Sequence, residues 1–240
     1  MKIAFFGDSY ADIGMEEFRT GTAWPEVLSK LLSVKKSGYY AVCGSSIWHA
    51  YNELKKYIYE YDVIVFCYSS AYRWPCLPDH LIGNNYLVHS YDDRFPEMSK
   101  YVDVYRELFT DDFLEFVSGS IFTAVNELCK KHDKFLINIC CFGKEFNRTS
   151  TEYPIFYNID KVSINEIVVQ NNKTVTMREV IHVQGNNDKR QCHLNTSNNK
   201  ILAEIFKDVI ENKTSNLESD LYSEYEWVRF DPEVNKWFGK

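Results

Sequence analysis

The sequence has no excess of positive charge and no long apolar run. Its 240 residues hold 27 Lys and Arg against 34 Asp and Glu, which gives a formal net charge of -7. Proteins that bind phosphate backbones usually carry a basic face, so this balance argues against a nucleic-acid partner. No stretch approaches the roughly 18 consecutive apolar residues of a membrane span, and the first apolar run, residues 3–6, is too short for the core of a signal peptide. We therefore expect a cytoplasmic protein that binds neither nucleic acid nor membrane.

The residue types that usually bind metals and cofactors also lack the spacing that such sites need. The seven cysteines include no CxxC pair, so neither a zinc site nor a disulfide scaffold is indicated. Acidic pairs at residues 92–93 and 111–112 are typical of solvated loops and helix starts, and no glycine-rich phosphate loop is present. We expect no metal and no cofactor, and the sequence leaves the oligomeric state open.

Short apolar runs alternate with stretches of helical spacing along most of the chain. The runs at residues 3–6, 39–43, 63–67 and 135–140 are typical of buried strands. Helices are predicted over residues 22–32, 47–58, 98–131 and 196–210, the third with breaks near Thr110 and Gly119. This alternation predicts an α/β fold with a mainly parallel sheet.

One domain is expected over residues 1–212, because no repeat or linker interrupts it. Residues 74–96 lack a sustained period and predict an irregular insertion, and loops of that length usually carry function. A hairpin is predicted around residues 167–176. Residues 213–240 form an acidic and aromatic C-terminal extension.

Three polar turns follow the first three predicted strands. They are Gly7-Asp8-Ser9, Gly44-Ser45-Ser46 and Ser69-Ser70. Sites in parallel sheets form at the carboxyl ends of the strands, so the chemistry is expected there. Ser9 is a candidate nucleophile if a base lies near it, and otherwise part of a polar turn. His193, in a polar loop before the last predicted helix, is the candidate base, and its alternative is a surface residue.

This combination of strand-end glycines, serine and late histidine resembles the SGNH (GDSL-type) hydrolase family over residues 1–212. The resemblance implies a flavodoxin-like three-layer sandwich in which Ser9 attacks an ester carbonyl and His193 moves the proton. It also implies an oxyanion hole made by the backbone N–H groups of Ser9 and Gly44 and by an asparagine side chain.

The sequence departs from the family pattern at two positions. No asparagine follows the third strand, so Ser70 is expected to supply the third oxyanion donor, with Ser69 as the weaker alternative. The family aspartate three residues before the histidine is replaced by Arg190. Asp188 is then the candidate for orienting His193, and the alternatives are a backbone carbonyl or an inactive site.

The function predicted from the residues and the resemblance is a serine-dependent ester hydrolase. Its expected partner is a small-molecule or carbohydrate ester, such as an O-acylated carbohydrate, with Arg73 and Arg190 as candidate substrate contacts. Two alternatives stay open. The same Ser-His site could serve an acyltransferase, and the two departures from the pattern would also fit a catalytically impaired binding or assembly module.

Overall fold

A six-stranded parallel sheet forms the centre of the computed structural model, which describes residues 1–14, 21–71, 73, 109–141, 151–157, 196–213 and 218–220. The strands are β1 (Lys2–Gly7), β2 (Lys36–Ala41), β3 (Val63–Tyr68), β4 (Phe135–Cys140), β5 (Ile155–Tyr157) and β6 (Glu218–Asp220). The helices are α1 (Trp24–Leu31), α2 (Ile47–Tyr57), α4 (Asp111–Lys131) and α7 (Thr196–Asn212), and the 3₁₀ turn η2 (Ile58–Glu60) follows α2.

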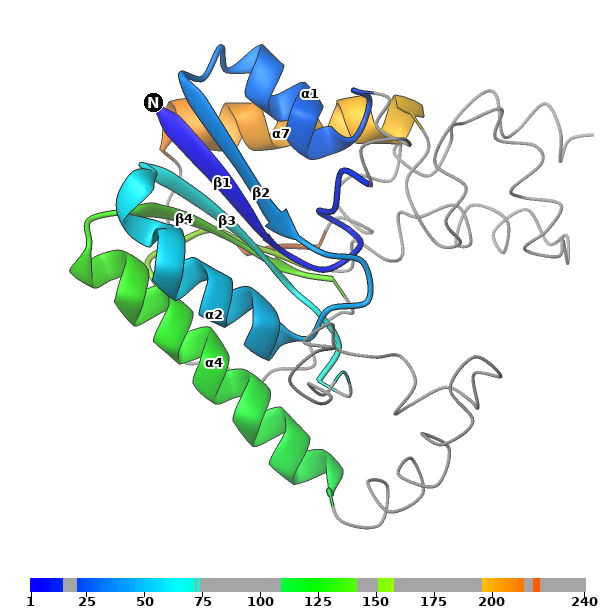
Figure 1. Cartoon of the computed structure of the whole chain (residues 1–240), viewed down its shortest axis with the longest axis vertical. Helices are drawn as coiled ribbons and strands as arrows, with labels where there is room; N and C mark the ends of the chain where they lie inside the picture. The colour runs from blue at the N-terminus through cyan, green and yellow to red at the C-terminus, as the bar shows by residue number, and fades with distance from the viewer. Residues whose placement is uncertain are drawn as a thin grey trace, which may run out of the picture.

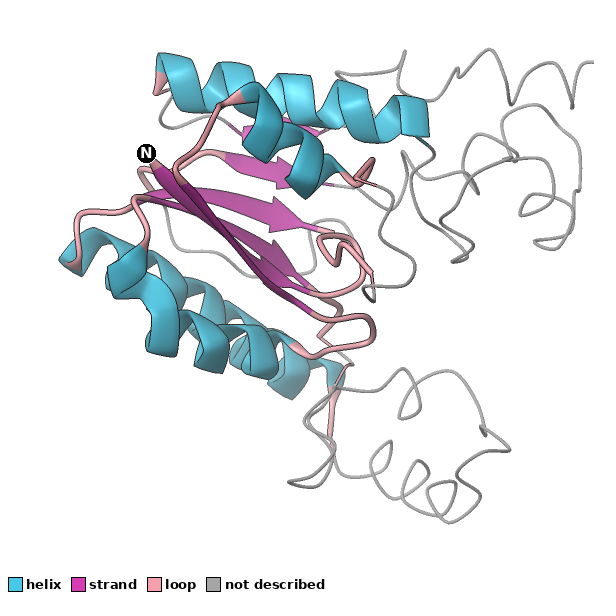
Figure 2. Cartoon of the chain, turned by 45° about the horizontal axis from the view of Figure 1, so that its top comes forward, coloured by secondary structure: helices cyan, strands magenta, loops and turns pink. Residues whose placement is uncertain are grey.

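The strands lie in the order β2-β1-β3-β4-β5-β6, and every neighbouring pair is parallel. The first five strands therefore have the flavodoxin-like order, in which the winding direction reverses beside β1 and β3. Helices cover both faces of the sheet, α1 and α7 on one and α2 and α4 on the other (Figures 1 and 2). The predicted fold class, a three-layer α/β sandwich with a parallel sheet, is confirmed.

Alternating side chains of the central strands build a hydrophobic core on each face of the sheet. In β1, Ile3 and Phe5 pack with the residues of α1 and α7, whereas Ala4 and Phe6 pack with those of α2 and α4. All six residues of β3 are buried. A strand covered on both faces is typically a continuous apolar run, which is why β1 and β3 could be predicted closely; β4 departs from such a run only at Asn138.

The predictions for β2 and α4 differ from the structure. Strand β2 begins three residues earlier than predicted, at Lys36, because a strand at the edge of the sheet tolerates polar residues. Gly119 does not break α4, which runs unbroken for 21 residues. Burial of Phe122 and Val125 against the sheet outweighs the cost of about 1 kcal/mol for one helical glycine.

The last two strands of the sheet were not predicted, and two predicted segments lie outside the described residues. The short strand β5 was not predicted, and β6 takes the sheet into residues 218–220, which were expected to lie in the C-terminal extension. The predicted insertion at residues 74–96 and the hairpin at 167–176 lie outside the described residues. Within the ranges given above, no helix is long and apolar enough to cross a membrane.

Candidate active site

Ser9 lies in a tight turn directly after β1, and its side chain is buried. The N–H groups of Ala11 and Asp12 donate to the carbonyl of Asp8 at 3.1 and 3.0 Å. The Asp8 carboxylate accepts the N–H of Tyr10 at 3.1 Å, as an N-cap residue does at the start of a helix. These bonds fix the backbone on both sides of Ser9.

Gly7, the last residue of β1, is required by its conformation and by its neighbour. Its φ of 142° is one that side-chain-bearing residues rarely adopt, and a Cβ built there would lie 2.5 Å from the Cβ of Cys67 in β3. Only glycine allows β1 and β3 to approach this closely at the edge where the candidate site lies.

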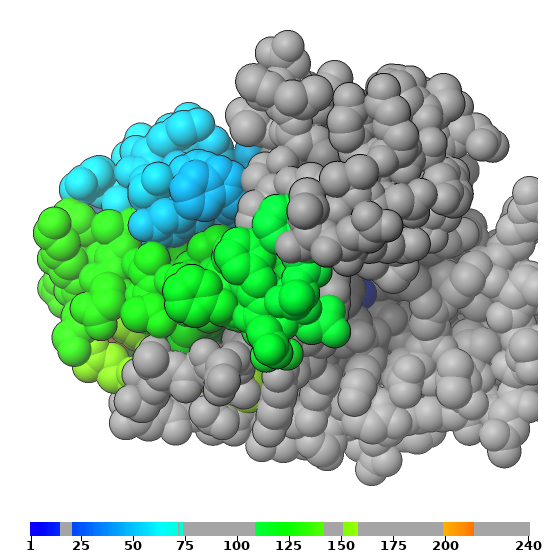
Figure 3. All heavy atoms as spheres, turned by 90° about the horizontal axis from the view of Figure 1, so that it is seen from below, coloured from blue at the N-terminus to red at the C-terminus, as the bar shows by residue number. Residues whose placement is uncertain are grey.

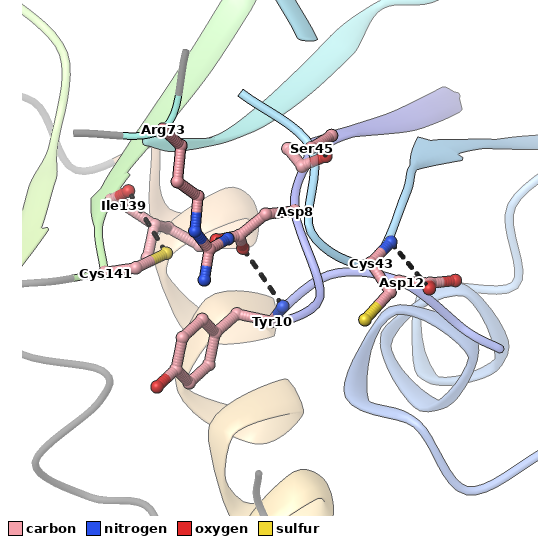
Figure 4. A network of polar contacts seen from close by, with 9 residues as sticks. Asp8, Tyr10, Asp12, Cys43, Ser45, Arg73, Ile139 and Cys141 are labelled. Carbon is pink, nitrogen blue, oxygen red and sulfur yellow. Dashed lines mark hydrogen bonds and ion pairs between the residues drawn. The ribbon is translucent and has the colours of Figure 1, made fainter. Parts of the chain in front are cut away.

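The turn after β2 is joined to the turn of Ser9 by three hydrogen bonds. The Ser45 hydroxyl and the Val42 N–H donate to the carbonyl of Gly7 at 2.8 and 3.1 Å. The Cys43 N–H donates to the carboxylate of Asp12 at 3.0 Å (Figure 4). Gly44, at a φ of 79°, sits in the middle of this turn. The bonds hold the Gly44 backbone beside the end of β1.

An ion pair joins the end of β1 to the segment after β3. The Arg73 guanidinium contacts the carboxylate of Asp8, and both side chains are buried (Figure 4). Burial raises the pKa of Asp8 above its ordinary value, and the charge of Arg73 offsets part of that rise. The buried Ser69 hydroxyl lies near enough to Asp8 to lower its pKa, although the two do not meet the geometry of an ordinary hydrogen bond.

The predicted site residues that follow β1, β2 and β3 therefore lie at the same edge of the sheet. Ser9 follows β1, Gly44 follows β2, and Ser70 and Arg73 follow β3, with the Arg73 N–H donating to the Ser70 carbonyl at 3.0 Å. Because Ser69 faces Asp8, Ser70 is the better candidate for a donor to substrate. Arg73, expected as a substrate contact, has its guanidinium on Asp8.

The start of α7 is tied to the same corner of the fold. The Trp24 indole N–H donates to the carbonyl of Tyr10 at 2.6 Å, and the Trp24 backbone N–H donates to the Asn199 side chain at 2.8 Å. Tyr10 adjoins Ser9 and Asn199 lies in the first turn of α7, so the two elements are linked through the start of α1. His193, Asp188 and Arg190 lie outside the described residues.

The sequence pointed to Asp8 and Arg73 but not to the contacts that brace this site. The Asp8–Arg73 pair joins residues 65 positions apart, and the Trp24–Asn199 bond joins residues 175 positions apart. No local pattern signals contacts at such separations. Among the described residues, no group of three His, Cys, Asp or Glu side chains is arranged to hold a metal ion.

No protein-family model matches the sequence, and no curated protein does. Solved structures with a similar fold include a protein assigned to the G-D-S-L lipolytic family from Desulfitobacterium hafniense DCB-2, at 11% identity over 57% of this chain with a TM-score of 0.34. That match spans 58% of the other protein's length. The esterase EstA from a Pseudoalteromonas species is 12% identical over 88% of this chain and 97% of its own, with a TM-score of 0.40. The acetyl xylan esterase AlAXEase is 13% identical over 88% of this chain and 100% of its own, with a TM-score of 0.41.

Proposed function

We propose that this protein is a serine-dependent ester hydrolase. Ser9 is the nucleophile, His193 the general base and Asp188 the residue that orients the histidine. The substrate class is a small acyl ester, for which an O-acylated carbohydrate is a suitable example. The proposal rests on Ser9 and its surroundings in the described structure, together with the position of His193 in the sequence.

The observation that carries the proposal is the link between the start of α7 and the turn of Ser9. The bonds through Trp24 hold the first turn of α7 to Tyr10. His193 precedes the first residue of α7, Thr196, by three positions, and three residues of extended chain span at most about 11 Å. This link supports a histidine base within reach of Ser9.

The chemistry divides into two steps. In the first, the Ser9 hydroxyl oxygen attacks the ester carbonyl while His193 takes its proton, and the alcohol then leaves with that proton as an acyl-serine ester forms. In the second, His193 takes a proton from water, the hydroxide attacks the acyl-serine, and the Ser9 oxygen regains the proton as the carboxylic acid leaves. Asp188 holds the imidazole in the tautomer that accepts the proton.

The negative charge that develops on the carbonyl oxygen needs donors at the same edge of the sheet. The N–H groups of Ser9 and Gly44 and the hydroxyl of Ser70 are the proposed donors. The fixed turns support this role, because donors held in place before the reaction need no reorganisation when charge develops. Loss of one such donor typically slows the reaction by about 100- to 1000-fold.

Labelling with a fluorophosphonate tests the nucleophile directly, because this reagent bonds covalently to activated serines. We expect wild-type protein to label and to hydrolyse p-nitrophenyl acetate, and Ser9→Ala and His193→Ala to do neither. Ser120→Ala, a serine replaced on an exposed face of α4, is the matched control and should behave like wild type. Folded wild-type protein that neither labels nor hydrolyses any acyl ester would overturn the proposal.

A further inference from the structure

A cavity of about 370 Å³ opens between the start of α2, the segment after β3 and the first half of α4. Ile47, Trp48, Ala71, Val117, Ser118 and Ile121 line it together with Arg73. Helices α2 and α4 lie side by side on this face of the molecule (Figure 3). Trp48 is 44% exposed, whereas Ile47, Ala71 and Ile121 are buried, so the cavity leads from the surface to the core.

The cavity adjoins the candidate active site through Arg73. The same side chain lines the cavity and contacts the carboxylate of Asp8, the residue before Ser9. The turn that holds Gly44 also leads directly into Ile47 and Trp48 at the start of α2. A group that occupies this cavity would therefore lie beside Arg73, which contacts the residue before Ser9.

The lining favours an apolar ligand over a polar one. Of the side chains that line it in the described part of the chain, five are hydrocarbon or aromatic, and Ser118 supplies one hydroxyl. Among the described residues of the lining, the single charge is that of Arg73, which already faces Asp8. A sugar ring would need a hydrogen-bond partner for each hydroxyl that it buries, and the described lining residues offer few such partners. An aliphatic chain needs none, and the volume lies within the usual range for small-ligand pockets.

We propose that this cavity receives the aliphatic acyl chain of the ester whose carbonyl reacts at Ser9. This inference rests on the proposed function and narrows its substrate class to esters of medium-length aliphatic acids. Each methylene that leaves water for such a cavity strengthens binding by about fourfold. The specificity constant should therefore rise from acetyl to octanoyl esters of the same alcohol.

This inference is tested by filling the cavity with a larger side chain and measuring the hydrolysis of the p-nitrophenyl esters of acetate, butanoate and octanoate. Val117 is only partly buried, so Val117→Phe adds a ring at the cavity with limited disturbance of the core. We expect this variant to lower the ratio of octanoyl to acetyl turnover by about tenfold or more. Glu127→Phe, the same new side chain at an exposed position of α4, is the matched control and should keep the wild-type ratio.

A binding measurement separates this inference from the proposed function, and it serves equally if Val117→Phe fails to fold. Octanoate added to Ser9→Ala protein should shift the NMR signal of the Trp48 indole N–H, which Trp48→Phe identifies by its loss. Two results would overturn the acyl-chain assignment. One is a protein that hydrolyses esters but whose ratio of octanoyl to acetyl turnover is unchanged by Val117→Phe. The other is an octanoate titration that does not shift the Trp48 signal. If no ester is hydrolysed, the proposed function fails, and the shift alone decides whether the cavity binds an aliphatic chain.

Discussion

Arg73 and Asp8 form an ion pair inside the protein, between the segment after β3 and the turn after β1. Both side chains are almost completely shielded from solvent. Burying a charge is costly unless it is paired, so each group needs the other. Because Asp8 adjoins Ser9, the pair couples the segment after β3 to the backbone of the candidate nucleophile.

Removal of the positive partner should destabilise the fold strongly. Arg73→Met leaves Asp8 as an unpaired buried acid, and we expect the free energy of unfolding to fall by about 3–5 kcal/mol. The double variant Asp8→Asn with Arg73→Met removes both charges and should be more stable than Arg73→Met alone. Urea unfolding of wild type, both single variants and the double variant measures the coupling free energy. Additive effects of the two substitutions would show that the pair contributes nothing.

Gly7 and Gly119 should respond in opposite ways to the same substitution. Gly7→Ala forces a side chain into a left-handed backbone conformation and against Cys67, so a loss of roughly 2–5 kcal/mol is expected from strain and overpacking. Gly119→Ala lies in the interior of α4 beside a surface cavity and should gain roughly 0.5–1 kcal/mol from helix propensity. Thermal unfolding of the two variants provides the comparison. Equal effects of both substitutions would contradict the close approach at Gly7.

The parts of the fold that the sequence predicted well are those with a local signature. Strands β1 and β3 contain continuous apolar runs because both of their faces are buried. Strand β4, apolar except for Asn138, was predicted with the bounds that the structure has. Strand β5 has three residues and β6 has three, which is too short for any periodic pattern to emerge. Their pairing depends on the rest of the sheet.

The candidate site also has a part that the sequence predicts and a part that it does not. The rule that sites form at the carboxyl ends of strands pointed to the turns of Ser9, Gly44 and Ser70, since glycine and serine after an apolar run are visible in sequence. The contacts that brace these turns were not predictable. The Asp8–Arg73 and Trp24–Asn199 contacts depend on how distant helices and strands pack.

A buried amide network in the core gives a further test. Asn138 in β4 accepts the Tyr68 hydroxyl at 2.9 Å, and it exchanges hydrogen bonds with Asn126 of α4 at 3.2 and 3.3 Å. Asn138→Leu would remove a partner of both and should cost roughly 2–4 kcal/mol, because an orphaned buried polar group costs about 1–3 kcal/mol. Tyr68→Phe, which removes one hydroxyl, should cost less. Urea unfolding ranks the two, and the reverse order would contradict the network.

Cysteine reactivity should follow burial. Cys43 is exposed, whereas Cys67, Cys129, Cys140 and Cys141 are buried. Burial raises the pKa of Cys129 to about 12 and that of Cys141 well above its ordinary value. Because the thiolate is the reactive form, iodoacetamide should modify Cys43 and spare these four in the folded protein. Peptide mass spectrometry locates the label, and the denatured protein is the control. Modification of Cys129 as fast as Cys43 would contradict its burial.

His49 in the first turn of α2 should make stability depend on pH. Burial lowers its pKa below the ordinary 6.5, although Glu53 offsets part of the shift. The unfolded chain therefore takes up a proton at a higher pH than the folded protein, so stability is full above the unfolded pKa and falls as pH drops through it toward the folded pKa. Compared with His49→Gln, wild type should lose stability as the pH falls below about 6.5, the ordinary pKa of the ring. Glu53→Gln should lower the pKa of His49 further, as NMR titration would show. A titration midpoint of the His49 ring at or above pH 6.5 in the wild-type protein would contradict the burial of the ring.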